Sequence, residues 1–217
     1  MAVSHAEIDR VLKILVQQQG MTTMLGRLSK KYDAFKVLIS TILSARAKDE
    51  VTEVIAGDLF KKYPDARSLA SANKKDVIKI IRRIGFFNAK SKNVINAAKM
   101  VLEKFGGRVP QTMEQLLELP GVGRKVANCV LVYAFQQDAI PVDIHVHRIS
   151  NRLGWVKTKQ PEDTEQALIK LVPQKHWQIV NDTFVAHGKT ICAPVSPFCS
   201  KCPIYKYCKR RGVLKSR

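Results

Sequence analysis

Apolar residues recur at helical spacing along nearly the whole chain, and this periodicity restricts what the sequence can fold into. Clear stripes occupy residues 8–15, 77–84 and 94–105, and each repeats at intervals of three and four. No run alternates convincingly with period two, so no strand is predicted. The 217 residues are therefore expected to form an all-α protein of about ten short helices joined by short loops.

Further helices are predicted over residues 124–135, 143–153, 163–172 and 176–187. Two helix starts have the spacing of a capping box, in which a hydroxyl and a side chain three residues later bond the exposed N–H groups: Ser4 with Glu7, and Thr112 with Gln115. Gly85 is expected to end the helix of residues 77–84 in the left-handed conformation.

The stretch LPGVGRKVAN, residues 119–128, interrupts this helical pattern. Pro120 cannot continue a helix, and Gly121 and Gly123 permit a tight turn or the close approach of another backbone. The next helix starts near Arg124, and its unpaired N–H groups and dipole together attract a phosphate. A helix-hairpin-helix here predicts that Gly121, Gly123 and Arg124 contact DNA without reading its base sequence. A plain glycine-containing corner between two helices is the alternative interpretation.

Lys125 lies in the first turn of that second helix. The helix dipole and Arg124 both lower the pKa of a lysine there, and a neutral amine is a nucleophile. The segment QQDAIPV is long enough to bring Asp143 back to the same end of the helix, where it begins a new helix as an N-cap. An ionised carboxylate near Lys125 favours the charged form of the amine, whereas the helix dipole disfavours it. The sequence therefore leaves the protonation state of Lys125 undecided. A solvated or phosphate-binding lysine and an aspartate that only caps are the alternatives.

Four cysteines near the C-terminal end have the spacing C-x6-C-x2-C-x5-C: Cys192, Cys199, Cys202 and Cys208. In a chain without a signal peptide, thiols this close together predict a metal site rather than disulfides. Zinc and iron–sulfur clusters both accept four cysteines, and the wide outer spacers favour a larger group, a [4Fe–4S] cluster, over zinc. Cys129 lies in a helical pattern and is expected to be a buried apolar residue.

The formal net charge of +19 limits the partners of the protein more than its fold. A strongly basic surface attracts polyanions, of which nucleic acid is the first candidate and an anionic membrane surface the second. No apolar run is long enough to span a membrane, and the start of the chain lacks the features of a signal peptide. We therefore expect no membrane contact and a cytoplasmic protein, associated with the nucleoid if the source is a prokaryote.

Several motifs together resemble the endonuclease III family of DNA glycosylase/AP lyases: LPGVGRKVANCVLVYAF, IPVDIHVHRISNRLGW, ILSARAKDE, IGFFNAKSKN and the four-cysteine segment. The resemblance covers nearly the whole chain, and the motifs occur in the family's order. It implies a two-domain helix-hairpin-helix glycosylase fold. A six-helix barrel domain would span residues 27–137, and an iron–sulfur cluster domain would combine 1–26 with 138–217, its cluster loop at 192–208.

By the same resemblance, Lys125 is the Schiff-base lysine, Asp143 the catalytic aspartate and the four cysteines the ligands of a [4Fe–4S] cluster. The implied reaction of base excision repair removes a damaged, oxidised pyrimidine from an extruded nucleotide and cuts the strand by β-elimination. We expect a monomer whose partner is double-stranded DNA with a damaged base or an abasic site. Arg46 and Phe86 match the positions that fill the vacated stack or wedge the duplex.

The sequence departs from the usual bacterial pattern near these positions. Arg46 replaces a glutamine, Phe86 replaces a leucine, and the motif DTH is DIH here. An arginine at position 46 predicts bidentate hydrogen bonds to an orphaned guanine, and a phosphate contact is the alternative. His145 and Arg148, about one turn apart after Asp143, are candidate phosphate contacts or solvated charges.

Three other functions compete with this one. Mismatch-specific thymine, uracil or adenine glycosylases share the fold, but they generally lack a lysine at the position of Lys125. A non-catalytic DNA-binding module explains the charge and the glycines, but it does not explain Lys125 together with Asp143. A zinc-bearing protein accounts for the cysteines, and it is distinguished by colour, since an iron–sulfur protein is brown.

Overall fold

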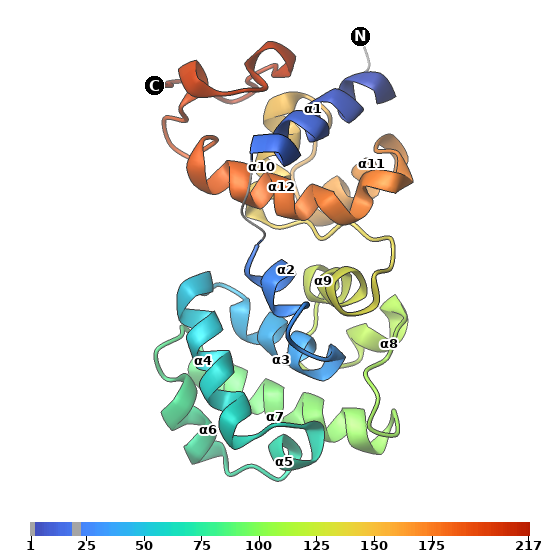
Figure 1. Cartoon of the computed structure of the whole chain (residues 1–217), viewed down its shortest axis with the longest axis vertical. Helices are drawn as coiled ribbons and strands as arrows, with labels where there is room; N and C mark the ends of the chain where they lie inside the picture. Colours follow the sequence, from blue (N-terminus) through green and yellow to red (C-terminus); the bar gives the residue numbers. More distant parts are fainter. Residues whose placement is uncertain (1–2, 19–22) are drawn as a thin grey trace. The chain divides into compact units, whose positions relative to one another are not determined.

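The structure, a computed structural model, describes residues 3–18 and 23–217, and the regular elements of that part of the chain are all helical (Figure 1). The α-helices are α1 His5–Gln18, α2 Met24–Leu28, α3 Ala34–Ser44, α4 Asp49–Lys62, α5 Ala66–Ala70, α6 Lys74–Ile81, α7 Phe87–Glu103, α8 Met113–Leu117, α9 Arg124–Phe135, α10 Ile144–Leu153, α11 Pro161–Leu171 and α12 Trp177–Thr190. Short 3-10 turns lie at Gln174–His176, Cys199–Lys201 and Tyr205–Tyr207. The all-α prediction is confirmed, and the four helices predicted after residue 123 match α9 to α12.

Packing contacts divide the chain into two compact units, each described here by itself. Unit 1 combines the two ends of the chain, Met1–Thr23 and Asp138–Arg217, and unit 2 is the continuous segment Met24–Gln137. Unit 2 therefore holds α2 to α9, and unit 1 holds α1 and α10 to α12. The roles of barrel domain and iron–sulfur domain stay predictions.

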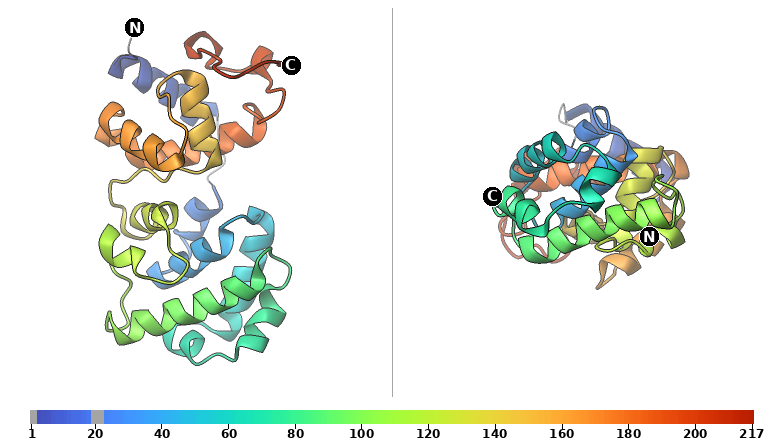
Figure 2. Two further views of the ribbon diagram at one scale, coloured as in Figure 1. Left: turned by 180° about the vertical axis from the view of Figure 1, so that it is seen from behind. Right: turned by 90° about the horizontal axis from the view of Figure 1, so that it is seen from below.

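Unit 2 is built around α3, whose side chains are buried along most of its length. A helix that is apolar on nearly all sides belongs inside a core, where other helices cover it. α3 packs against α4, α7 and α9, and α7 packs in turn against α5 and α6. Figure 2 shows the long green α7 lying across this group of helices. The helices that carry the glycine turn and the Arg46 loop thus share one core.

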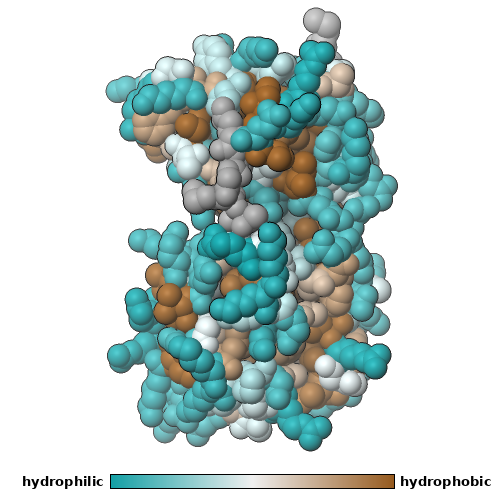
Figure 3. All heavy atoms as spheres, in the orientation of Figure 1, coloured by the Kyte–Doolittle hydropathy of each residue, from teal (hydrophilic) through white to brown (hydrophobic). Residues whose placement is uncertain are grey.

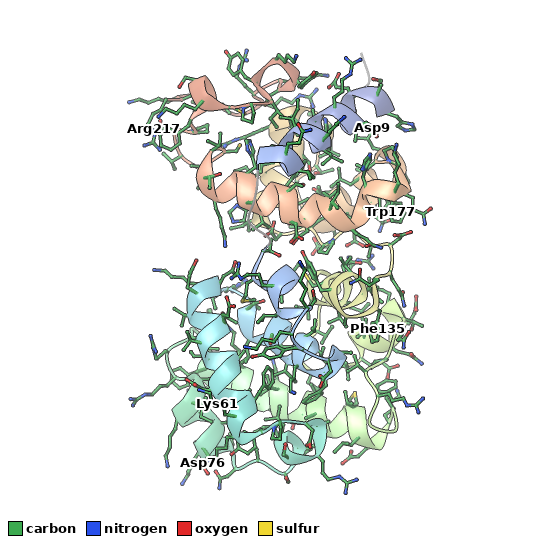
Figure 4. The ribbon with its side chains drawn as sticks, viewed as in Figure 1. Asp9, Lys61, Asp76, Phe135, Trp177 and Arg217 are labelled. Carbon is green, nitrogen blue, oxygen red and sulfur yellow. The ribbon has the colours of Figure 1, made fainter. Side chains whose placement is uncertain are left out.

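Unit 1 has a core to which both ends of the chain contribute. The predicted apolar stripe of α1 is fully buried, and it joins a cluster that includes Val180 and Phe184 of α12. α12 packs against both α1 and α10 (Figure 1). On its polar side α1 is tied to the segment before α12, since Asp9, labelled in Figure 4, accepts a hydrogen bond from Lys175 at 3.1 Å and lies 2.6 Å from His176 Nε2. The N-terminal helix is therefore part of the unit that carries the four cysteines.

Side-chain caps begin the helices where the sequence predicts them. Glu7 N donates to Ser4 Oγ at 3.2 Å, and Gln115 N donates to Thr112 Oγ1 at 3.4 Å. Each cap of this kind is worth about 1 kcal/mol because it satisfies an N–H group that the helix leaves unpaired. One half of each predicted capping box, the bond to the Ser4 or Thr112 hydroxyl, is therefore confirmed.

The prediction for Gly85 is wrong. α6 already ends at Ile81, and the residue with left-handed backbone angles is Phe86, with φ 60°, which lies at the N-cap of α7. A residue with a side chain rarely adopts this conformation without contacts that hold it there. The departure therefore marks the loop before α7 as a place where tertiary contacts override local preference.

Within the described residues, no helix has the length and apolar character needed to cross a bilayer. Hydrophilic residues predominate on the face drawn in Figure 3. Phe86 is one of the few large apolar side chains left exposed, at 63 %. It belongs to the candidate site.

Candidate functional site

The LPGVGRKVAN stretch forms the turn between α8 and α9 in unit 2. Val122 N donates to Leu119 O at 3.0 Å, and Gly121 has φ +83°, which only glycine adopts readily. A Cβ at Gly121 would also lie 2.9 Å from atoms of the Asn93 side chain. Gly123 is different, because its φ of −102° suits any residue and a Cβ there would meet nothing within 4 Å. The turn depends on Gly121, while Gly123 leaves open space before α9.

α9 begins at Arg124, directly after Gly123, which caps it without a side-chain hydrogen bond. The N–H groups of the first turn lie at the positive end of the helix dipole, where an anion is stabilised. Lys125, the second residue of this turn, is partly buried. The predicted start of the helix is confirmed, and it puts an amine next to a helix end that can hold an anion.

Asp143 is the N-cap of α10 in unit 1, as predicted. Its Oδ1 accepts hydrogen bonds from His145 N at 2.8 Å and from Val146 N at 2.9 Å. Both bonds reach the same oxygen, so capping does not occupy Oδ2. Lys125 and Asp143 belong to different units, and their closeness stays a prediction.

Arg148, a predicted phosphate contact, is directed toward the end of α12. Its guanidinium donates to Cys192 O at 2.9 and 3.1 Å and to Gly188 O at 3.2 Å, and it lies 3.1 Å from His145 Nδ1. Burial lowers the pKa of Arg148, and the nearby Arg152 adds to this effect. Contacts of Arg148 and His145 with DNA stay predictions, and the hydrogen bonds of Arg148 join α10 to Cys192 and to the end of α12.

Arg152, which sequence reasoning missed, continues this connection. It donates to Ala193 O and Pro194 O, both at 2.7 Å, and to Cys192 Sγ at 3.3 Å. The signal in the sequence is the spacing of four from Arg148, which puts both arginines on one face of α10. The helix α10, which Asp143 caps, therefore holds the backbone around Cys192.

The four cysteines line one pocket of unit 1. Apolar side chains from α10 and from the C-terminal segment complete its wall, among them Ile149, Leu153, Phe198 and Ile204. Arg217 contacts the same segment, since its N–H donates to Pro197 O at 2.8 Å and its guanidinium carbon lies 3.9 Å from the Phe198 ring centroid. The pocket thus has the thiols and the apolar shell that an iron–sulfur cluster requires.

The electrostatics of this pocket also fit a positively charged metal group. Burial raises the pKa of Cys202 to about 11 and raises that of Cys208, and neighbouring cysteines add to both shifts. Thiolates here therefore need the charge of bound metal. Arg210 N donates to Cys208 Sγ at 3.4 Å, as N–H groups do to cluster sulfurs. Within the described residues, no group of three or more His, Cys, Asp or Glu side chains is placed to hold a single metal ion.

His187 is a further pocket residue that lies close to a cysteine. Its Nε2 is 3.7 Å from Cys202 Sγ, and burial, with Arg148 nearby, lowers the pKa of the imidazole to about 4. The ring is therefore neutral at physiological pH.

Arg46 and Phe86, both predicted to contact DNA, are brought together in unit 2. The Arg46 guanidinium carbon lies 5.8 Å from the centroid of the Phe86 ring, within the range of a cation–π contact. Both residues have positive φ, 53° for Arg46 and 60° for Phe86. The sequence could not predict this pairing, because the two residues come from loops far apart in the chain.

Comparisons with known proteins identify the family of the chain. Residues 39–174 match the HhH-GPD superfamily of base excision DNA repair proteins. An endonuclease III of Thermotoga maritima is 47 % identical over 186 residues, which cover 84 % of this chain and 87 % of that protein. The chain belongs to the endonuclease III family. It is a DNA glycosylase with AP lyase activity that acts in base excision repair, so the alternative of a non-catalytic module is wrong.

Solved structures agree with membership in the endonuclease III family. The chain is similar to the endonuclease III in a non-covalent complex with DNA, with a TM-score of 0.87, 30 % identity, and 96 % of each chain covered. It is also similar to a thermostable thymine-DNA glycosylase, with a TM-score of 0.82, 25 % identity, and 94 % of this chain and 96 % of the other covered. Members of the endonuclease III family carry a [4Fe–4S] cluster.

Proposed function

We propose that this glycosylase/lyase excises oxidised pyrimidines from double-stranded DNA as a monomer, with Lys125 as its nucleophile. The observation that carries the proposal is the position of Lys125 in the first turn of α9, directly behind the Gly121–Gly123 turn. The similarity to an endonuclease III bound to DNA supports duplex DNA as the partner. The net charge of +19 supports the same partner through attraction to phosphates.

In this proposal the hairpin holds one DNA strand by its backbone. The N–H groups at the start of α9 bind a phosphate, Gly123 leaves room for it, and Arg124 adds positive charge. The nucleotide next to the bound phosphate leaves the stack, because its C1′ cannot be reached inside the duplex. The hairpin thereby brings the sugar to the amine of Lys125.

The first chemical step exchanges one bond to C1′ for another. The neutral amine of Lys125 attacks C1′, the bond between C1′ and the base breaks, and the base leaves with its electron pair. Asp143 either stabilises the positive charge that develops on the sugar or accepts the proton that the lysine nitrogen loses. Its Oδ2 suits both roles, since the capping bonds reach Oδ1.

The second step cuts the strand. Opening of the sugar ring gives a Schiff base between Lys125 Nζ and C1′, which makes a 2′ proton acidic. Removal of that proton moves electrons toward C3′ and expels the 3′ phosphate by β-elimination, and water then releases the lysine. Sodium borohydride reduces the Schiff base to a stable amine, so wild-type protein is expected to become covalently attached to abasic-site DNA. A preparation that cuts DNA without any covalent capture would contradict the proposal.

The four cysteines of the pocket would hold a [4Fe–4S] cluster. When bound, the cluster would supply the positive charge that the partly buried thiolates need and would fix the loop of residues 192–208. Arg152 and Arg210 N–H groups bond two of the sulfurs. Cations on that loop, such as Lys201 and Lys206, are then held in place to meet phosphates.

Asp143→Asn is expected to slow strand cutting at an abasic site by about 10²- to 10⁴-fold, because it removes the carboxylate charge. Asparagine caps a helix as well as aspartate does, so the free energy of unfolding should change by less than about 0.5 kcal/mol. Asp143→Ala is the matched variant, since it also loses the cap at a cost of about 1 kcal/mol. Single-turnover cutting and urea unfolding measure the two effects, and wild-type cutting by the asparagine variant would rule out a chemical role for Asp143.

The two hairpin glycines are expected to respond differently to alanine. Gly121→Ala should lower the free energy of unfolding by about 1–3 kcal/mol, because of its positive φ and the contact with Asn93. Gly123→Ala should cost only about 0.5 kcal/mol as a poorer cap, yet weaken DNA binding, since the methyl group enters the space meant for phosphate. Fluorescence anisotropy with an abasic-site duplex tests this, and unchanged affinity in Gly123→Ala would place the phosphate elsewhere.

The base opposite the lesion is expected to matter through Arg46. Cutting of one lesion should be about tenfold better opposite guanine than opposite adenine, the scale of one bidentate base contact. Arg46→Gln should remove most of that preference. Rates for the two duplexes, compared between wild type and variant, test the idea, and equal ratios in both proteins would leave Arg46 as a phosphate contact only.

Thymine or uracil in a mismatch is a second candidate substrate, supported by the similarity to a thermostable thymine-DNA glycosylase. A panel of duplexes with thymine glycol, uracil opposite guanine and thymine opposite guanine separates the two substrate classes. Preferential cutting of thymine glycol supports the oxidised pyrimidine, and preferential cutting of the mismatches supports the second candidate.

A further inference from the structure

Two loops of unit 2 approach each other where Arg46 and Phe86 lie. Arg46 follows the end of α3, and Phe86 precedes α7. The guanidinium of Arg46 lies over the Phe86 ring, and a Cβ at Gly85 would be 3.9 Å from the carbonyl oxygen of Arg46. The two loops therefore lie close enough together for their side chains to meet.

The backbone of both residues is held in an uncommon conformation. Arg46 and Phe86 each have left-handed φ, although neither is a glycine. Residues with side chains keep such angles only where surrounding contacts impose them. Both side chains are exposed nevertheless, and the cation–π contact joins them to each other.

Lys90 connects the start of α7 to the end of α3. Its ammonium donates to Leu43 O at 2.8 Å, in the last turn of α3 and three residues before Arg46. Its backbone N–H donates to Phe86 O at 2.9 Å, which is the ordinary first-turn bond of α7. The side chain is only 5 % exposed, and burial lowers the pKa of Lys90. The carbonyl end of α3 favours a cation, which offsets part of the cost of burying the amine. In the described part of the chain no carboxylate forms an ion pair with it.

We propose that Lys90 is a positioning residue that holds Arg46 and Phe86 together as one stacked unit, which enters the duplex where the damaged nucleotide leaves it. The proposal rests on the proposed function, because it assumes that these side chains meet DNA. It adds that the two act jointly: the ring supplies an apolar surface against the neighbouring base pair, and it also holds the guanidinium toward the orphaned base. Removing either side chain should then lose most of the DNA affinity that the two side chains provide together.

The test is a double-mutant cycle on binding to a duplex with a stable abasic-site analogue. Arg46→Gln, Phe86→Leu and the double variant are compared first with wild-type Lys90 and then with Lys90→Met. With Lys90 present, the two substitutions should be non-additive by about three- to tenfold in Kd, the scale of one cation–π contact. With Lys90→Met, the same two substitutions should become additive. Lys99→Met, an exposed lysine further along α7, is the matched control and should leave the coupling intact.

A spectroscopic measurement separates positioning from a general loss of structure. A 2-aminopurine placed opposite the abasic site reports on stacking, and its fluorescence change on binding should be reduced in Lys90→Met. Borohydride capture at saturating protein should stay near the wild-type level, because an abasic site has no base to be extruded.

Additive effects with Lys90 present, or undiminished coupling in Lys90→Met, would overturn the proposal. Absence of capture by the wild-type protein would instead overturn the proposed function. If Lys90→Met does not fold, the cycle with Lys90 present still decides whether the pair acts jointly.

Discussion

Lys125→Ala is expected to abolish borohydride capture and to reduce strand cutting at an abasic site by at least about a thousandfold. The reason is covalent: without the amine no Schiff base forms, and without the Schiff base the 2′ proton is not acidic enough to be removed. The fold should be preserved, because alanine is the best residue for a helix interior and α9 continues for ten residues beyond position 125. The measurement is single-turnover cutting of a duplex with one abasic site, with and without borohydride.

Arg124→Ala is the matched control for this prediction. It removes a neighbouring cation from the same helical turn and leaves the amine in place. It should weaken DNA binding, while capture at saturating protein remains. Strand cutting that survives Lys125→Ala undiminished would mean that another nucleophile performs the reaction, and the role of Lys125 would then be limited to binding.

The second large effect is expected at the cysteine pocket. Cys202→Ala should yield protein without the visible absorbance of an iron–sulfur cluster and with a segment after α12 that proteases cut readily. Cys202 is partly buried and lines the pocket with the other three cysteines, and without the bound group these three thiols lose the charge that stabilises their thiolates. Iron and sulfide analysis, absorption spectra and limited proteolysis measure the loss.

Cys129→Ala is the control for the cluster prediction. Cys129 is fully buried in α9 and does not line the pocket, so its removal should leave the colour unchanged. The small cavity it creates should lower the free energy of unfolding by about 1 kcal/mol. A colourless wild-type protein that contains one zinc per chain would contradict the cluster and support the zinc alternative.

Local features of the fold could be predicted from the sequence because they depend on neighbouring residues. The apolar stripe of α1, the start of α9 after Gly123 and the cap at Asp143 all follow from spacing over a few positions. The cysteines could likewise be predicted to share one site, since thiols so close in sequence can reach one another.

Features that depend on distant contacts could not be predicted in the same way. The Lys90 ammonium bonds to a carbonyl 47 residues away, and nothing near Lys90 in the sequence marks it as different from the exposed lysines around it. The left-handed angle expected at Gly85 is found at Phe86 instead, because contacts between two loops decide it. The residues of the candidate site could therefore be predicted from the sequence, whereas the pairing of Arg46 with Phe86 is seen only in the fold.

The division of unit 1 between the two ends of the chain has a consequence for biosynthesis. Unit 2 is continuous, so it can fold while the ribosome is still translating the rest. The helix α1 leaves the ribosome before unit 2, but the α12 residues that bury its apolar side are made after unit 2. During translation α1 therefore presents an unpaired hydrophobic surface, and we expect nascent chains halted after unit 2 to recruit chaperones through this N-terminal helix.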